Sequence, residues 1–99
     1  MKYFMVEGTL KDAHLINDTI MKDHMAYTQM ATDQGVILMS GLKKDMSGGI
    51  FVMKDESIEK IEEYLSNEPF RVNEIQTYRV VEFSAHYFNE SPSEWFNKK

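Results

Sequence analysis

The chain has 99 residues, of which 42% are apolar and 27% are charged, the composition of an ordinary globular domain. Its 16 acidic side chains outnumber 11 basic ones and give a net charge of −5, a field that repels phosphate backbones and argues against a nucleic-acid partner. The absence of cysteine excludes disulfides, thiolate catalysis and cysteine-bound metals, and it fits a reducing compartment.

The length of the chain bounds both the domain count and the core. A chain this short buries only about two-thirds of its unfolded surface, so a partner chain would add stability. No apolar run approaches the roughly 20 residues of a membrane span, and the N-terminal MKYFMVEG is too short for the apolar part of a signal peptide. We therefore expect one cytoplasmic domain over residues 1–99, with a core over 1–84, a C-terminal arm over 85–99 and no membrane partner.

The first third of the chain predicts a strand followed by a long helix. Residues 2–7, KYFMVE, are rich in aromatic and β-branched types, which predicts a strand that is apolar on both faces and ends at Gly8. After a polar connection, Asn17 or Asp18 can cap a helix by accepting from the free amides of its first turn. Gly35 ends this helix, because glycine readily adopts the left-handed conformation of a C-terminal cap.

The rest of the chain predicts three more strands and a second helix. VILMSG, residues 36–41, is a strand, and the Gly48–Gly49 pair marks a hairpin connection to a third strand over 50–54. The elements that follow are a helix that begins at Asp55 or Ser57 and stops at Pro69, and a strand over 75–84.

The predicted order is β-α-β-β-α-β, which is the ferredoxin-like arrangement of a four-stranded antiparallel sheet. Right-handed crossovers place both helices on one face of the sheet. Because the strands are apolar on the opposite face as well, we expect a homodimer that packs sheet on sheet. The C-terminal arm carries four aromatic residues, so we expect it to be tied down, for example on a second subunit: Tyr87, Phe88, Trp95 and Phe96.

His24 is the one side chain that the pattern singles out as a candidate for chemistry. It lies in a row of residues along one side of the predicted helix that should face the core. The row consists of Ile20, His24, Tyr27 and Ala31. An imidazole titrates near neutrality and can act as a general acid or base, particularly when a carboxylate fixes its tautomer. The same position also fits a histidine at the core edge that bonds to the backbone or to Tyr27.

Several pieces between residue 1 and about residue 88 form a pattern through their order and spacing: KYFMVEG, DHMAY with Gly35 one helix length later, the strand that ends at Ser40–Gly41, the Gly48–Gly49 pair, SIEKIEEYL, the EPF turn and the closing strand into Glu82–Phe83. In this pattern the chain resembles the YciI-like (YCII-related) family of the dimeric α+β barrel superfamily. The resemblance implies an active-site pair of a histidine, which maps onto His24, and an aspartate of a DPF turn. Glu68 of Asn67-Glu68-Pro69-Phe70 stands at that aspartate's position.

Other residues are candidates for substrate binding. Ser40 and Gly41 could bind a substrate oxygen at a strand end, and Glu7 could project into the same cleft. Phe70 and Tyr3 could wall it. Each also has an ordinary role, as a strand end, an exposed acid or a core aromatic.

Metal and phosphate sites are not predicted. His14, His24 and His86 lie in separate elements without metal-ligand spacing, and no glycine-rich phosphate loop occurs. We expect no cofactor.

The resemblance implies a small-molecule-binding protein that transfers a proton without a cofactor, as a lyase or isomerase, with His24 and Glu68 as its pair. Two alternatives remain open, a non-catalytic binding or sensor module and a cofactor-free oxygenase.

Overall fold

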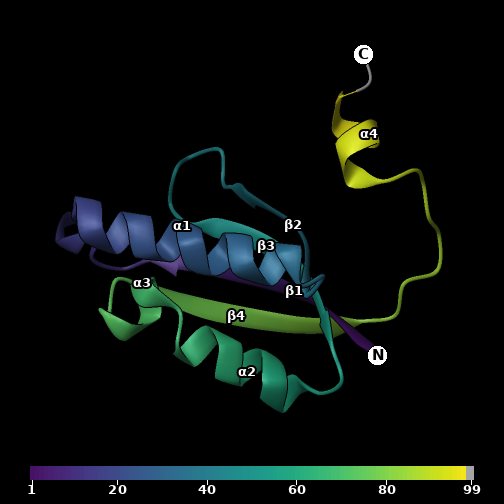
Figure 1. Ribbon diagram of the computed structural model, residues 1–99, viewed down its shortest axis with the longest axis horizontal. Helices are drawn as coiled ribbons and strands as arrows, with labels where there is room; N and C mark the ends of the chain where they lie inside the picture. Colours follow the sequence, from purple (N-terminus) through teal and green to yellow (C-terminus); the bar gives the residue numbers. More distant parts are fainter. Residues whose placement is uncertain (98–99) are drawn as a thin grey trace.

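A four-stranded antiparallel sheet carries both long helices on one face in the computed structural model, which describes residues 1–97 (Figure 1). Neighbouring strands follow the order β2-β3-β1-β4, and all three neighbouring pairs are antiparallel. This is the predicted ferredoxin-like βαββαβ fold. The elements are β1 (Lys2–Leu10), a 3-10 turn η1 (Ala13–Leu15), α1 (Asp18–Asp33), β2 (Ile37–Leu42), β3 (Gly49–Asp55), α2 (Ile58–Ser66), α3 (Pro69–Val72), β4 (Gln76–Phe83) and α4 (Pro92–Asn97).

The core lies between the sheet and the two long helices. Every second side chain of a strand points to the same face, so β1 and β3 each turn one set of side chains toward α1 and α2. The buried cluster consists of Phe4, Val6, Phe51 and Met53 from β1 and β3, Ile37 from β2, Ala31 from α1, and Ile61 and Leu65 from α2.

The helix boundaries follow from local capping groups. The Asn17 side chain accepts a hydrogen bond from the Ile20 amide at 2.8 Å, and Ser57 accepts from the Lys60 amide at 3.3 Å. Gly35 has φ 79°, the left-handed conformation predicted for the end of the first helix. Pro69, which was predicted to stop the second helix, begins the short helix α3.

β1 is longer than its sequence pattern predicts. It continues past Gly8 to Leu10 because its last residues still have partners, Leu10 pairing with Gln76 of β4 and the Leu10 amide donating to the Ser47 carbonyl at 2.7 Å. Gly8 is therefore an interior strand residue. Residue 48 is also a glycine, and a close backbone contact explains why. A Cβ atom on Gly48 would lie 1.8 Å from the Gly8 carbonyl oxygen.

The sheet face opposite the helices is bare within one chain. Exposed apolar side chains stand on it from three strands: Tyr3 and Met5 from β1, Ile50 from β3 and Val81 from β4. The strands are thus apolar on both faces, as the sequence predicts.

The C-terminal arm leaves the end of β4 and extends away from the sheet (Figure 1). Its four aromatic residues are exposed within the single chain. The rings of Trp95 and Phe96 pack edge to face, with their centroids 4.8 Å apart. No helix among the described residues is long and apolar enough to cross a membrane.

The burial pattern predicts a large difference between two leucine-to-alanine substitutions. Leu65→Ala should lower the free energy of unfolding by about 2–5 kcal/mol, because it removes buried methyl groups from the core. Leu38→Ala is the matched control and should cost less than about 1 kcal/mol, since Leu38 is exposed. Urea denaturation of both variants measures this, and equal losses would contradict the core described above.

Candidate functional site

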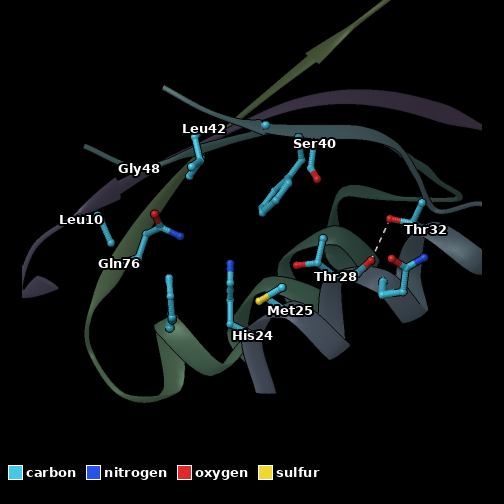
Figure 2. Close-up of a pocket in the computed structure, with 14 residues that line it drawn as sticks. Leu10, His24, Met25, Thr28, Thr32, Ser40, Leu42, Gly48 and Gln76 are labelled. Atoms are coloured by element: carbon cyan, nitrogen blue, oxygen red, sulfur yellow. Dashed lines mark hydrogen bonds between the residues drawn. The ribbon is translucent and has the colours of Figure 1, made fainter. Parts of the chain in front are cut away.

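A cavity of about 410 Å³ opens between α1 and the ends of the strands near the β2–β3 hairpin (Figure 2). Its apolar lining comes from Leu10, Met25, Leu42, Phe51 and Phe70, its polar side chains from His24, Thr28, Gln29, Thr32, Ser40 and Gln76, and its backbone lining from Gly41, Gly48 and Gly49. His24 is the one ionisable side chain in this lining. The cavity therefore favours a small, largely apolar molecule with a few hydrogen-bonding groups.

His24 reaches the cavity from the second turn of α1. Its Nδ1 atom bonds to the Oε1 atom of Glu68, and its ring stacks on the Phe70 ring with the centroids 3.8 Å apart and the planes 5° from parallel. Figure 2 shows a nitrogen at the tip of the His24 ring directed into the cavity. The imidazole is thus held on one edge and on one face, while its other nitrogen is available to a ligand.

Glu68 is fully buried, and the local sequence determines its position. A residue before proline favours extended backbone, and Glu68 has φ −68° and ψ 130°, which makes it the N-cap of α3. Its Oε2 atom accepts from the Phe70 amide at 2.8 Å and from the Arg71 amide at 3.3 Å. The Tyr78 hydroxyl donates to the same oxygen at 2.7 Å.

The bond between His24 and Glu68 depends on which of the two groups carries the proton. An ionised carboxylate only accepts hydrogen bonds, so beside an ionised Glu68 the Nδ1 atom of His24 is the donor. In the neutral imidazole the Nε2 atom is then an acceptor that faces the cavity. A carboxylate that orients an imidazole in this way prepares it to take a proton from a bound molecule.

Two residues of β4, Gln76 and Tyr78, complete the site, and the sequence analysis did not name either of them. The Gln76 side chain donates from its Nε2 atom to the Tyr78 hydroxyl at 2.9 Å. Burial raises the pKa of Tyr78 above its ordinary value of 10.0, and the negative charge of Glu68 raises it further. Side chains two positions apart on a strand point to the same face, so both lie on the face toward the helices. This alternation is the sequence signal that could have identified them.

Thr28 was also missed by the sequence reasoning. It follows His24 by one helical turn, so the helical spacing places it on the same side of α1. Its hydroxyl oxygen is buried close to the Tyr64 hydroxyl and makes no hydrogen bond of ordinary geometry among residues 1–97. Thr28 lines the cavity, but this oxygen is not exposed to it.

The structure brings together five of the seven residues named from the sequence. His24 and Glu68 are bonded, and Ser40, Gly41 and Phe70 line the same cavity, with Ser40 labelled on the wall across from His24 in Figure 2.

Tyr3 and Glu7 do not reach the cavity. Both lie at odd positions of β1, whose side chains point to the bare face, whereas the buried Phe4 and Val6 point to the helices. Glu7 pairs there with Lys43 at 2.8 Å, and this hydrogen bond and the nearby positive charge lower the pKa of Glu7.

Among the residues that the structure describes, no three histidine, aspartate or glutamate side chains gather as a metal site requires.

Glu68→Gln tests the direction of the hydrogen bonds. Three donors meet at the Oε2 position, so the amide oxygen should take that place and the amide NH₂ should face His24. Nδ1 must then accept, and the imidazole should change to the tautomer that carries its proton on Nε2. Nitrogen-15 chemical shifts of the His24 ring report this change directly.

Glu62→Gln is the matched control, because Glu62 is an exposed acid on α2. It should leave the His24 shifts as they are in the unaltered protein. An unchanged tautomer in Glu68→Gln would contradict the assignment of the His24–Glu68 bond.

Comparisons with known proteins agree with this fold. The YCII-related domain matches residues 1–84. A search of curated proteins finds no match. Among solved structures, the chain is similar to 5-chloro-2-hydroxyhydroquinone dehydrochlorinase (TftG) from Burkholderia phenoliruptrix AC1100 in complex with 2,5-dihydroxybenzoquinone, with a TM-score of 0.65 and 17% sequence identity over 85% of this chain and 95% of that chain.

At that identity the structural match establishes the fold alone, the four-stranded antiparallel sheet with helices on one face. The family match covers nearly the whole of the sheet and its two long helices, and it includes both residues of the buried pair. The chain therefore belongs to the YCII-related family.

Proposed function

We propose that the protein binds a small organic molecule in the cavity and moves a proton on it without a cofactor, as a lyase or an isomerase does. His24 is the general acid or base, and Glu68 orients it. The observation that carries the proposal is the buried Glu68 carboxylate, which holds Nδ1 of His24 while the rest of the ring faces the cavity.

The chemistry follows from the two nitrogens of the ring. Nε2 takes a proton from the bound molecule, and the Glu68 carboxylate stabilises the imidazolium that forms. The same nitrogen returns the proton to another atom in an isomerisation, or a leaving group departs in an elimination. Ser40 and Gly41 lie on β2 and offer a hydroxyl and an amide to an oxygen on which negative charge develops.

The substrate class follows from the lining. Apart from His24 the cavity presents no ionisable side chain, and aromatic rings of Phe51 and Phe70 stand in its wall. An oxygenated ring or a similarly flat molecule fits these walls. The similar fold of a dehydrochlorinase that was solved with 2,5-dihydroxybenzoquinone supports this class and an elimination.

Substitution of His24 tests the catalytic role. Hydroxylated and halogenated hydroquinones, including 5-chloro-2-hydroxyhydroquinone, are incubated with the protein in D₂O, and halide release and deuterium uptake are followed by NMR. His24→Gln should lower the rate by about 10²- to 10⁴-fold, the usual contribution of a positioned acid or base.

His14→Gln is the matched control, because His14 is an exposed histidine in η1 outside the cavity lining. Its rate should equal that of the unaltered protein. Turnover that survives in His24→Gln would overturn the catalytic role, and ligand binding without turnover in the unaltered protein would favour a sensor.

We also propose that the protein is a cytoplasmic homodimer through the bare sheet face. An apolar surface contributed by three strands favours a second sheet as its cover, and the absence of cysteine fits a reducing compartment. Two copies of the same face satisfy the symmetry of such an interface.

Val81→Glu tests the dimer, since it places a charge beside Met5 among the apolar side chains of the bare face. Sedimentation at micromolar concentration should give a dimer for the unaltered protein and a monomer for this variant. Met30→Glu, at an exposed methionine of α1 on the other side of the sheet, is the control and should remain dimeric. A monomeric unaltered protein would contradict the proposal.

A further inference from the structure

The hydrogen bonds behind His24 form a chain whose direction is fixed at one end. Glu68 is fully buried, and its Oε2 atom accepts from the Phe70 and Arg71 amides. Tyr78 has one hydroxyl proton, which it donates to Glu68 at 2.7 Å. The oxygen of Tyr78 can therefore only accept from its next neighbour.

That neighbour is the side-chain amide of Gln76. Its Nε2 atom donates to the Tyr78 oxygen at 2.9 Å, so the amide must turn its NH₂ group toward Tyr78. Gly8 lies directly beneath the amide, and a Cβ atom there would come within 2.7–2.9 Å of its three outer atoms. With 3% of its surface exposed, the Gln76 side chain cannot move elsewhere without displacing its surroundings, and only a half-turn that exchanges its amide oxygen and nitrogen is open to it.

With its NH₂ group bonded to Tyr78, the Gln76 amide has its oxygen left as a hydrogen-bond acceptor. It makes no hydrogen bond within the described part of the chain, although the side chain belongs to the cavity lining. Figure 2 shows Gln76 at the end of the cavity formed by Leu10 and Gly48, with His24 nearby. This end of the cavity consequently presents two acceptors, the Oε1 atom of Gln76 and the Nε2 atom of neutral His24.

We propose that this end of the cavity selects hydroxyl groups, so that the ligand is a phenol or an enol rather than its ether or an all-carbonyl analogue. Gln76 is the specificity-determining residue. Tyr78 is a positioning residue, because it turns the Gln76 amide without touching the ligand. The inference rests on the proposed function in one respect, that the ligand occupies this cavity.

The chain of bonds can be tested without any ligand. In nitrogen-15-labelled protein, one proton of the Gln76 side-chain NH₂ should be protected from exchange with solvent, because it is bonded to Tyr78 and buried. Tyr78→Phe removes the acceptor and should abolish that protection. Tyr64→Phe is the matched control, since the Tyr64 hydroxyl bonds to the Tyr27 carbonyl outside the cavity lining.

Selection is tested with a matched pair of probes, 1,2,4-trihydroxybenzene kept reduced under anaerobic conditions and 1,2,4-trimethoxybenzene. The unaltered protein and Tyr64→Phe should bind the triol more tightly than the ether. In Tyr78→Phe the amide can turn and donate to an ether oxygen, so the ratio of the two affinities should fall about tenfold, the value of one hydrogen bond.

Gln76→Leu serves as a second variant in case Tyr78→Phe does not fold. It removes the acceptor and leaves the Tyr78–Glu68 bond in place, and it should lower the same ratio by a similar factor. A ratio that is unchanged in these variants, or Gln76 protection that survives in Tyr78→Phe, would overturn the inference. If neither probe shifts the resonances of Ser40 and Gln76, the proposed function fails, while the protection experiment still decides the direction of the amide.

Discussion

The burial of one carboxylate, that of Glu68, joins the elements that make the site. Its two oxygens receive donors from three places, the imidazole on α1, the first amides of α3 and a hydroxyl on β4. A buried carboxylate without donors would cost several kcal/mol, so these groups must stay in register for the fold to be stable. The same bonds that satisfy the charge also fix the orientation of His24.

The turn that carries Glu68 shows how a short stretch of sequence achieves this. Pro69 sets the extended backbone of the preceding residue and supplies the first residue of α3, and Phe70 then places its ring against the imidazole. The resemblance assigns an aspartate to the position of Glu68. The longer side chain still caps its own turn with one oxygen and meets His24 with the other, so the extra methylene does not separate the pair.

Local signals predict the fold well and the site only in part. Gly35 marks the end of α1 through its left-handed backbone, as predicted, whereas α2 ends at Ser66 and Pro69 begins α3. The extension of β1 to Leu10 depends on pairing with Gln76, a contact between distant residues that no local pattern records. The contact of His24 with Glu68 spans 44 positions, and the family resemblance indicated it where spacing could not. Glu7 was grouped with the site because it ends the first predicted strand, and Tyr3 as an aromatic wall, although alternation along β1 turns both away.

The contact between Gly8 and Gly48 lies at one end of the cavity, and the two ends therefore differ in their freedom to change. At the glycine end backbone atoms touch, and a side chain on Gly48 would push the hairpin off β1. On the α1 side, the lining includes exposed side chains such as Met25 and Gln29, which substitution can enlarge or shrink without disturbing the sheet. Divergence among relatives of this chain should therefore alter the α1 side of the cavity first, while the glycine end stays constant.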